Sequence, residues 1–181
     1  MLPERLLFVG MMGVGKSTVG QMTALRLGWE FFDSDAQILA KTGRTVPEIF
    51  AESGEFAMRD VEREVFDEAL ASVSRSVVAV AGGVVLLPAA RARLVRSGVV
   101  VWLRARIETL ALRVGEGRGR PHLGVDPMKA LVDLYEVRRP LYESVADVVI
   151  DVDDLTSEEV VQRVLVVSHF VREEPGGDQS V

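Results

Sequence analysis

The chain of 181 residues contains no cysteine and no asparagine, and it has only two histidines. Without cysteine it can form neither a disulfide nor a thiolate metal site. His122 and His169 are far apart in the sequence, so they do not suggest a metal-ligand cluster. The missing asparagine also removes the Asn-Lys-x-Asp sequence that a GTP-driven switch normally uses to recognise guanine.

Long hydrophobic runs and a basic charge balance are absent as well. No apolar run reaches the length that spans a membrane, and a formal net charge of −6 argues against bulk nucleic-acid binding. Met1 to Arg5 leads directly into an apolar run, so we expect no signal peptide, no membrane partner and a cytoplasmic protein.

Five short apolar runs alternate with helical patterns, at residues 5–10, 29–33, 77–81, 99–103 and 147–151. Continuous apolar runs are typical of parallel strands that helices bury on both faces. We therefore predict an α/β fold of three layers, with a five-stranded parallel sheet flanked by helices. Ligands in such folds bind at the carboxyl ends of the strands.

Two regions depart from this alternation. Residues 34–73 are predicted to form a helical insertion, and the Gly- and Arg-rich residues 113–126 are predicted to form a mobile loop. The polar residues 172–181 are expected to be a disordered tail. We predict a single domain over residues 1–171.

The most specific motif is a glycine-rich loop that fits the pattern G-x-x-x-x-G-K-[ST]. It is Gly10-Met11-Met12-Gly13-Val14-Gly15-Lys16-Ser17. An apolar run precedes it and a helical pattern over 16–27 follows, which a chance glycine-rich turn would lack. In such loops the backbone N–H groups and the helix N-terminus bind phosphate, the lysine reaches the β- and γ-phosphates, and the hydroxyl ligates Mg²⁺. The motif therefore predicts binding of a nucleoside triphosphate.

Two carboxylates follow the second apolar run, at Asp33 and Asp35. One reading is a helix N-cap, for which Asp is favoured. Beside a phosphate-binding loop we prefer a second reading, in which one carboxylate lies near Mg²⁺ and the other faces a second substrate.

Further polar groups follow the other runs. Arg59 and Glu62 share a helix face and form either a surface ion pair or an arginine held ready for a substrate carboxylate. Gly82 and Gly83 form either an ordinary turn or a place where a ligand approaches the backbone.

Several arginines suit anions. Arg118 and Arg120 lie in the predicted loop, where they are either solvated or delivered to a phosphoryl group when the loop closes. Residues 138–142, Arg-Arg-Pro-Leu-Tyr, are predicted to sit at a join between helices, where one arginine could complete an anion site.

Taken in order, these motifs resemble the shikimate kinase family, small P-loop kinases related to nucleoside monophosphate kinases. The resemblance covers residues 5 to 168. Its motifs are Gly10 to Thr18, Phe32 to Asp35, Lys41 to Arg44, Pro47 to Phe50, Gly54-Glu55 with Arg59 and Glu62, Gly82-Gly83, Arg120-Pro121 and Arg138 to Tyr142.

The resemblance implies ATP- and Mg²⁺-dependent phosphorylation of the 3-hydroxyl of shikimate, in aromatic amino-acid biosynthesis, by a monomer whose partners are small molecules. It implies nucleotide contacts at Gly13, Val14, Gly15, Lys16, Ser17, Thr18, Arg113 and Arg120. Ser17, together with Asp33 acting through water, would hold the metal.

The same resemblance assigns the second substrate. Asp35 would orient or deprotonate the attacking hydroxyl, and Arg59 and Arg138 would grip the carboxylate. Gly82 and Gly83 would supply backbone contacts. Residues 113–126 would be the lid, with Arg120 on the transferred phosphoryl group, so the catalytic set is Lys16, Asp35 and Arg120.

The chain departs from the family pattern at two places. Ala81 replaces the first of three usual glycines, and Met58 replaces a usual phenylalanine. Three alternatives remain: a kinase for another acid such as gluconate, a nucleoside monophosphate kinase, or an inactive homologue. The last would be expected to lose Lys16, an aspartate or an arginine that this chain retains.

Overall fold

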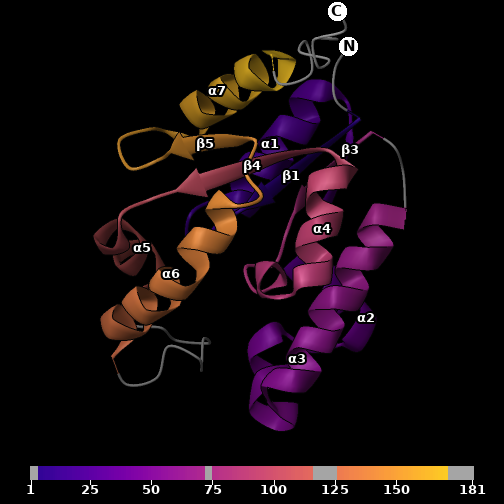
Figure 1. Cartoon of the computed structure of the whole chain (residues 1–181), viewed down its shortest axis with the longest axis vertical. Coiled ribbons are helices and arrows are strands. Elements are labelled where there is room, and N and C mark those ends of the chain that lie inside the picture. The colour runs from indigo at the N-terminus through magenta and orange to yellow at the C-terminus, as the bar shows by residue number, and fades with distance from the viewer. Residues whose placement is uncertain (1–3, 72–74, 116–125, 171–181) are drawn as a thin grey trace, which may run out of the picture.

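The computed structural model describes residues 4–71, 75–115 and 126–170. Five parallel strands form one sheet in the order β2-β3-β1-β4-β5. The strands are β1 (Arg5–Val9), β2 (Glu30–Asp33), β3 (Ser76–Ala79), β4 (Val99–Arg104) and β5 (Val148–Asp151). Helices cover both faces of this sheet (Figure 1), so the predicted α/β fold is confirmed.

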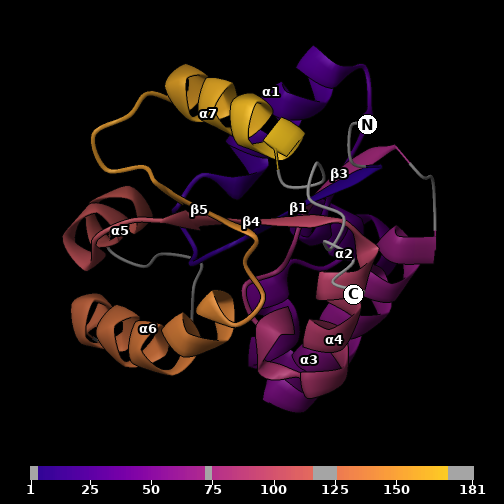
Figure 2. The same ribbon diagram turned by 45° about the horizontal axis from the view of Figure 1, so that its top comes forward.

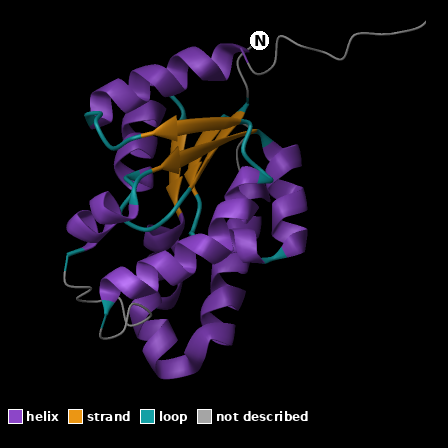
Figure 3. Cartoon of the chain, turned by 60° about the vertical axis from the view of Figure 1, so that its left-hand side comes forward, coloured by secondary structure: helices purple, strands orange, loops and turns teal. Residues whose placement is uncertain are grey.

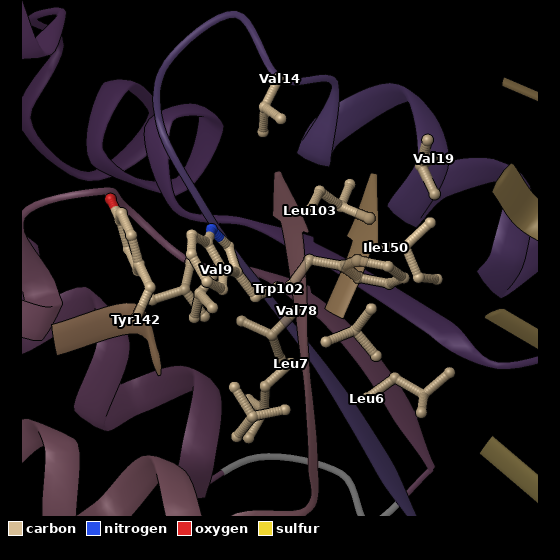
Figure 4. Packing of buried hydrophobic residues seen from close by; sticks show 14 of the residues in the cluster. Leu6, Leu7, Val9, Val14, Val19, Val78, Trp102, Leu103, Tyr142 and Ile150 are labelled. Carbon is tan, nitrogen blue, oxygen red and sulfur yellow. The ribbon is translucent and has the colours of Figure 1, made fainter. Parts of the chain in front are cut away.

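The central strand β1 explains why the apolar runs do not alternate. Leu7 pairs with Val78 of β3 on one side and with Val100 of β4 on the other. Helices α1 (Lys16–Leu27) and α7 (Ser157–Phe170) lie on one face, and α3 (Val46–Ala71), α4 (Pro88–Ser97) and α6 (Pro127–Glu143) lie on the other (Figure 2). Side chains on both faces of the strands are therefore buried, as the close view of the core shows (Figure 4).

Strand β3 is shorter than its apolar run. It ends at Ala79, because the chain then turns into a short 3-10 helix, Val84–Leu86, in which Val84 N–H donates to the Ala81 carbonyl at 3.1 Å. The apolar residues Val80 and Ala81 remain buried in that turn. The turn brings Gly82 and Gly83 to the carboxyl end of the sheet.

Helices α2 (Ser34–Thr42) and α3 occupy most of the region predicted as an insertion. Their own small core is Ile38, Ile49, Met58 and Val65. Gly54, with φ of 79°, interrupts the helical geometry of α3. The pair extends past the sheet (Figures 1 and 3), so it can form one wall of a cleft.

The predicted helix join at residues 138–142 is wrong. Helix α6 runs without a break from Pro127 to Glu143, with Pro140 inside it. An internal proline removes one backbone hydrogen bond, and packing of this helix against the sheet tolerates that cost.

Helix α5 (Ile107–Val114) leads into the segment predicted as a lid, and residues 116–125 of that segment lie outside the described residues. The expected tail at 172–181 also lies outside them. In the parts of the chain that the structure describes, no helix is long and apolar enough to cross a membrane.

Candidate active site

A cleft of about 940 Å³ lies at the carboxyl ends of β1, β2 and β3, bounded by α2 and α3. The structure brings most of the predicted site residues to its walls. They are Gly13, Gly15, Lys16, Ser17, Thr18, Asp33, Asp35, Arg59, Gly82, Gly83, Arg113 and Arg138. Among the predicted site residues that the structure describes, Val14 is the exception, because its side chain is buried in the core.

The glycine-rich loop joins β1 to α1. Gly13 and Gly15 have φ of 79° and 102°, in the left-handed region where a side chain is strained. Gly15 is the N-cap of α1 and offers no side-chain oxygen to the N–H groups of the first turn. Those N–H groups and the positive end of the helix are therefore suited to a phosphate.

Lys16 folds back over this loop. Its ammonium group donates to the carbonyl oxygens of Gly10 at 2.9 Å and Met11 at 3.1 Å. These contacts hold a positive charge at the mouth of the loop, where phosphate oxygens would compete with the two carbonyls for the same donor.

Asp33 and Asp35 stand where β2 passes into α2. Asp33 is the N-cap of α2, and its Oδ1 accepts from the N–H groups of Asp35 at 2.9 Å and Ala36 at 3.2 Å. Asp33 therefore caps a helix, as the first of the two readings of these carboxylates predicted. This cap does not conflict with a role toward a ligand, because both aspartates also line the cleft.

Arg59 and Glu62 form an ion pair inside the cleft. Arg59 Nη1 lies 2.7 Å from Glu62 Oε2, and their side chains are only 17% and 7% exposed. A surface ion pair is thus excluded. Burial raises the pKa of Glu62, and the charge of Arg59 partly offsets that rise.

Arg138 reaches the same cleft from α6. It is 4% exposed, and its Nε has no hydrogen-bond partner among the residues that the structure describes. Burying an unpaired guanidinium donor is costly, so an anion in the cleft would satisfy it. Arg139, the adjacent arginine, instead pairs with Glu143 on the exposed face of α6.

Glycine at position 83 is favoured by the closeness of its neighbours and not by its backbone conformation. Its φ is −85°, which any residue can adopt, but a Cβ there would overlap the Arg59 guanidinium and lie 2.6 Å from Glu62 Oε2. Ala81 has no positive φ and is buried, so its backbone does not require the usual glycine. Met58 is 3% exposed and presents an apolar surface to the cleft.

Arg113 lies at the end of α5, against the glycine-rich loop. Its two Nη atoms donate to the carbonyls of Val14 at 3.5 Å and Val152 at 3.3 Å. Next to it, Val114 packs so closely that a Cβ on Gly13 would lie 2.8 Å from Val114 Cγ2. The start of the predicted lid is therefore seated on the phosphate-binding loop. Arg120 lies outside the described residues.

The protein groups available to a metal are few. The described residues hold no group of three or more His, Asp or Glu side chains that could bind an ion. Ser17 and Asp33 both line the cleft beside the loop. One hydroxyl and one carboxylate fit Mg²⁺, which keeps several waters and takes further oxygens from substrate phosphates.

Tyr142 was quoted in the motif at residues 138–142, but the sequence alone assigned it no role. Its hydroxyl donates to the Gly82 carbonyl at 3.0 Å from a fully buried position. The signal was its place four residues after Arg138, which puts the two side chains on one face of a helix.

A parallel sheet whose phosphate-binding loop opens into a cleft that also holds Arg59 and Arg138 is typical of a P-loop kinase of a small anionic molecule. The family model for shikimate kinase matches residues 12–168. The chain belongs to the shikimate kinase family.

Individual relatives agree. A shikimate kinase of Streptomyces coelicolor is 44% identical over 160 residues, which cover 88% of this chain and 92% of the relative. One of Burkholderia lata is 47% identical over 145 residues, covering 80% and 78%.

Solved structures give the same result. The shikimate kinase of Acinetobacter baumannii in complex with shikimate has a TM-score of 0.90 at 35% identity, over 96% of this chain and 97% of that one. A gluconokinase of Sinorhizobium meliloti shares the fold, with a TM-score of 0.62 at 22% identity over 92% of each chain.

Proposed function

We propose that this cleft transfers the γ-phosphoryl group of ATP to the 3-hydroxyl of shikimate, giving shikimate 3-phosphate and ADP. One observation carries the proposal. A buried arginine with an unpartnered donor, Arg138, lies in the same cleft as a phosphate-binding loop. The cleft is thus built for a phosphorylated nucleotide and a second anion at once.

The nucleotide half consists of the loop and α1. Backbone N–H groups from Gly13 to Thr18 bind the phosphates, and Lys16 exchanges its carbonyl partners for the β- and γ-phosphate oxygens. Lys16 then stabilises the negative charge of the transferring group. Arg113, already seated on Val14, borders the rest of the nucleotide.

Magnesium belongs beside this half of the cleft. Ser17 would hold the ion directly and Asp33 would hold it through water. The carboxylate of Asp33 is oriented by the two backbone N–H groups that donate to it. When bound, the ion supplies charge neutralisation at the β- and γ-phosphates.

The acid half consists of α2, α3, α6 and the turn after β3. Arg59, held by Glu62, and Arg138 bind the substrate carboxylate, since a guanidinium fork matches its two oxygens. Gly82 and Gly83 allow the substrate to approach the backbone. Asp35 accepts a hydrogen bond from the attacking hydroxyl and so orients it toward the phosphate-binding loop.

The proposal extends to the segment after α5. Residues 113–126 act as a lid that brings Arg120 to the phosphoryl group and excludes water. Residues 1–171 form one domain. We further propose that the protein acts on small molecules as a monomer in the cytoplasm.

A panel assay tests this function. ADP release is followed with shikimate, quinate, gluconate and nucleoside monophosphates as acceptors, with Mg²⁺ and with a chelator. We expect turnover of shikimate that needs Mg²⁺ and exceeds that of every other acceptor. Faster turnover of gluconate or a nucleotide would overturn the substrate assignment.

A further inference from the structure

Tyr142 is a buried phenol in the last turn of α6. Its side chain is fully buried, and its ring stacks on Trp102 of β4 with centroids 5.7 Å apart and planes inclined by 30°. Figure 4 shows the two rings side by side, with the phenol oxygen at the end remote from the aliphatic core. The packed ring therefore holds its hydroxyl in one place.

That hydroxyl joins two groups of the acid half of the cleft. It donates to the Gly82 carbonyl at 3.0 Å, and the nearby Arg138 guanidinium opposes the rise in its pKa that burial causes. Both side chains lie against Gly82, since a Cβ there would lie 3.2 Å from Arg138 Nη1 and 3.4 Å from the Tyr142 oxygen.

The contact with Gly82 has a consequence for the next residue. A peptide group is planar and trans, so the N–H of Gly83 points away from the carbonyl of Gly82. Fixing this carbonyl therefore fixes the direction in which the Gly83 N–H is presented. Both glycines line the cleft, so a substrate meets a backbone donor whose orientation Tyr142 sets.

The contact with Arg138 supports the charge that binds the acid. Tyr142 follows Arg138 by four residues, one helical turn along the same face of α6. Burial raises the pKa of Tyr142 to about 12, so the phenol stays neutral and keeps its proton for Gly82. It thereby donates to Gly82 beside the Arg138 guanidinium, whose Nε has no partner among the residues that the structure describes.

We propose that Tyr142 is a positioning residue for acid binding, which clamps the Gly82 carbonyl and the Arg138 guanidinium through one hydroxyl. The inference rests on the proposed function, because it takes Arg138 and the glycine turn as the site of the shikimate carboxylate. Tyr142 does not touch the substrate. It determines where the groups that do so are held.

The first test is Tyr142→Phe, which removes the hydroxyl and keeps the ring. The variant removes one polar neighbour from each of two buried groups, the Gly82 carbonyl and the Arg138 guanidinium. This loss predicts a rise of about tenfold in the KM for shikimate. The KM for ATP and the kcat at saturating shikimate are expected to stay within about twofold, because neither depends on this clamp. A merely structural role would lower the melting temperature without separating the two KM values.

Tyr135→Phe is the matched control. It removes the only other tyrosine hydroxyl in the chain, two turns earlier on the same helix and outside the cleft lining. It is expected to leave both KM values unchanged. If wild-type enzyme uses shikimate and Tyr142→Phe leaves the KM for shikimate within twofold of that value, this inference is overturned and the proposed function stands. A wild-type enzyme with no shikimate turnover overturns both.

A double variant tests the route through Arg138. If Tyr142 acts by holding Arg138, then Tyr142→Phe in an Arg138→Lys background should raise the KM for shikimate by less than it does alone. Effects that multiply would show that the two residues act independently, against the proposal.

A spectroscopic test does not depend on folding of the Tyr142 variant. Incorporation of 3-fluorotyrosine into Tyr135→Phe labels position 142 alone. We expect its ¹⁹F resonance to shift when shikimate is added and to stay in place with a non-hydrolysable ATP analogue. No shift with shikimate, or equal shifts with both ligands, would overturn the proposal.

Discussion

The guanidinium of Arg59 packs directly against the Cα of Gly83. A Cβ at that position would overlap Arg59 Nη1 and would lie 2.6 Å from Glu62 Oε2. The Arg59 guanidinium on α3 can therefore lie this close to the turn after β3 because position 83 has no side chain. Since the φ of Gly83 is −85°, the requirement comes from its neighbours and not from its backbone.

This contact predicts that Gly83→Ala weakens shikimate binding. The methyl group would displace the Arg59 guanidinium and its partner Glu62, and loss of a charge-assisted carboxylate contact costs about 1.5–3 kcal/mol, or roughly 10- to 100-fold in affinity. The KM for ATP should change little. Steady-state measurements with each substrate varied in turn give both values.

Ala81→Gly is the control for Gly83→Ala. It changes the same turn, removes a methyl group and restores the three glycines usual in the family. Because Ala81 has no positive φ, we expect only a small effect on either KM. A Gly83→Ala enzyme with a normal KM for shikimate would mean that Arg59 finds another productive position.

Arg59→Lys should also weaken shikimate binding far more than ATP binding. Lysine keeps the charge but lacks the planar fork that matches a carboxylate. Loss of the paired bonds should cost about 1.5–3 kcal/mol of shikimate binding. Calorimetric titration with each ligand separately measures the two affinities.

The neighbouring Arg63→Lys provides a comparison on the same helix. Its side chain is 54% exposed and pairs with Asp60 at the surface, so we expect no effect on either ligand. An equal loss of both ligands in Arg59→Lys would point to general damage of the cleft and against a carboxylate site at Arg59.

Much of this architecture could be predicted from local pattern. The apolar runs are buried on both faces, and the glycine-rich loop carries its own spacing, so the sheet and the phosphate site follow from short stretches of sequence. The position of Asp33 was also predictable, because a carboxylate at the end of β2 can both cap the helix that follows and line the cleft.

Other features depend on tertiary packing, which no short pattern contains. Pro140 suggested a helix join, yet α6 continues through it because packing outweighs the lost hydrogen bond. The steric reason for Gly83 needs α3 to lie beside it. Likewise, Tyr142 acquires its hydrogen bond to Gly82 only when residues 60 positions apart meet.

Glu62 predicts a dependence of stability on pH. Its pKa is raised from 4.5 by burial and by Asp35, against the opposing charges of Arg59 and Arg138. Between pH 4.5 and the raised pKa, the folded protein therefore holds this proton to a greater extent than the unfolded chain does. The free energy of unfolding contributed by this group should fall as pH rises from 4.5 through the raised pKa, and stay level below 4.5.

Urea denaturation of wild type and Glu62→Gln over this pH range measures the effect as a difference between the two curves. Glu64→Gln, on the exposed side of the same helix, shows whether the slope belongs to position 62. If the free energy of unfolding of the wild type minus that of Glu62→Gln instead increases with pH, then Arg59 and Arg138 lower the pKa of Glu62 below 4.5.

Arg120→Ala tests the proposed lid, whose first residues the structure places against the phosphate-binding loop. Arg113 donates to Val14, and Val114 packs on Gly13, so the end of α5 is in direct contact with the loop that we expect to bind the nucleotide. From the sequence alone, we expect glycines to make that segment permissive and Pro121 to fix φ just beyond Arg120.

If Arg120 meets the phosphoryl group mainly in the transition state, Arg120→Ala should lower kcat by about 10³-fold or more while the affinity for shikimate changes little. Arg118→Ala, two residues earlier, is the matched control and should retain most of the activity. Hydrogen exchange over residues 113–126 measures closure separately, and we expect slower exchange only when an ATP analogue and shikimate are both present. Unchanged exchange together with a normal kcat in Arg120→Ala would leave this segment without a part in catalysis, and the transition-state charge would then rest on Lys16 and the metal alone.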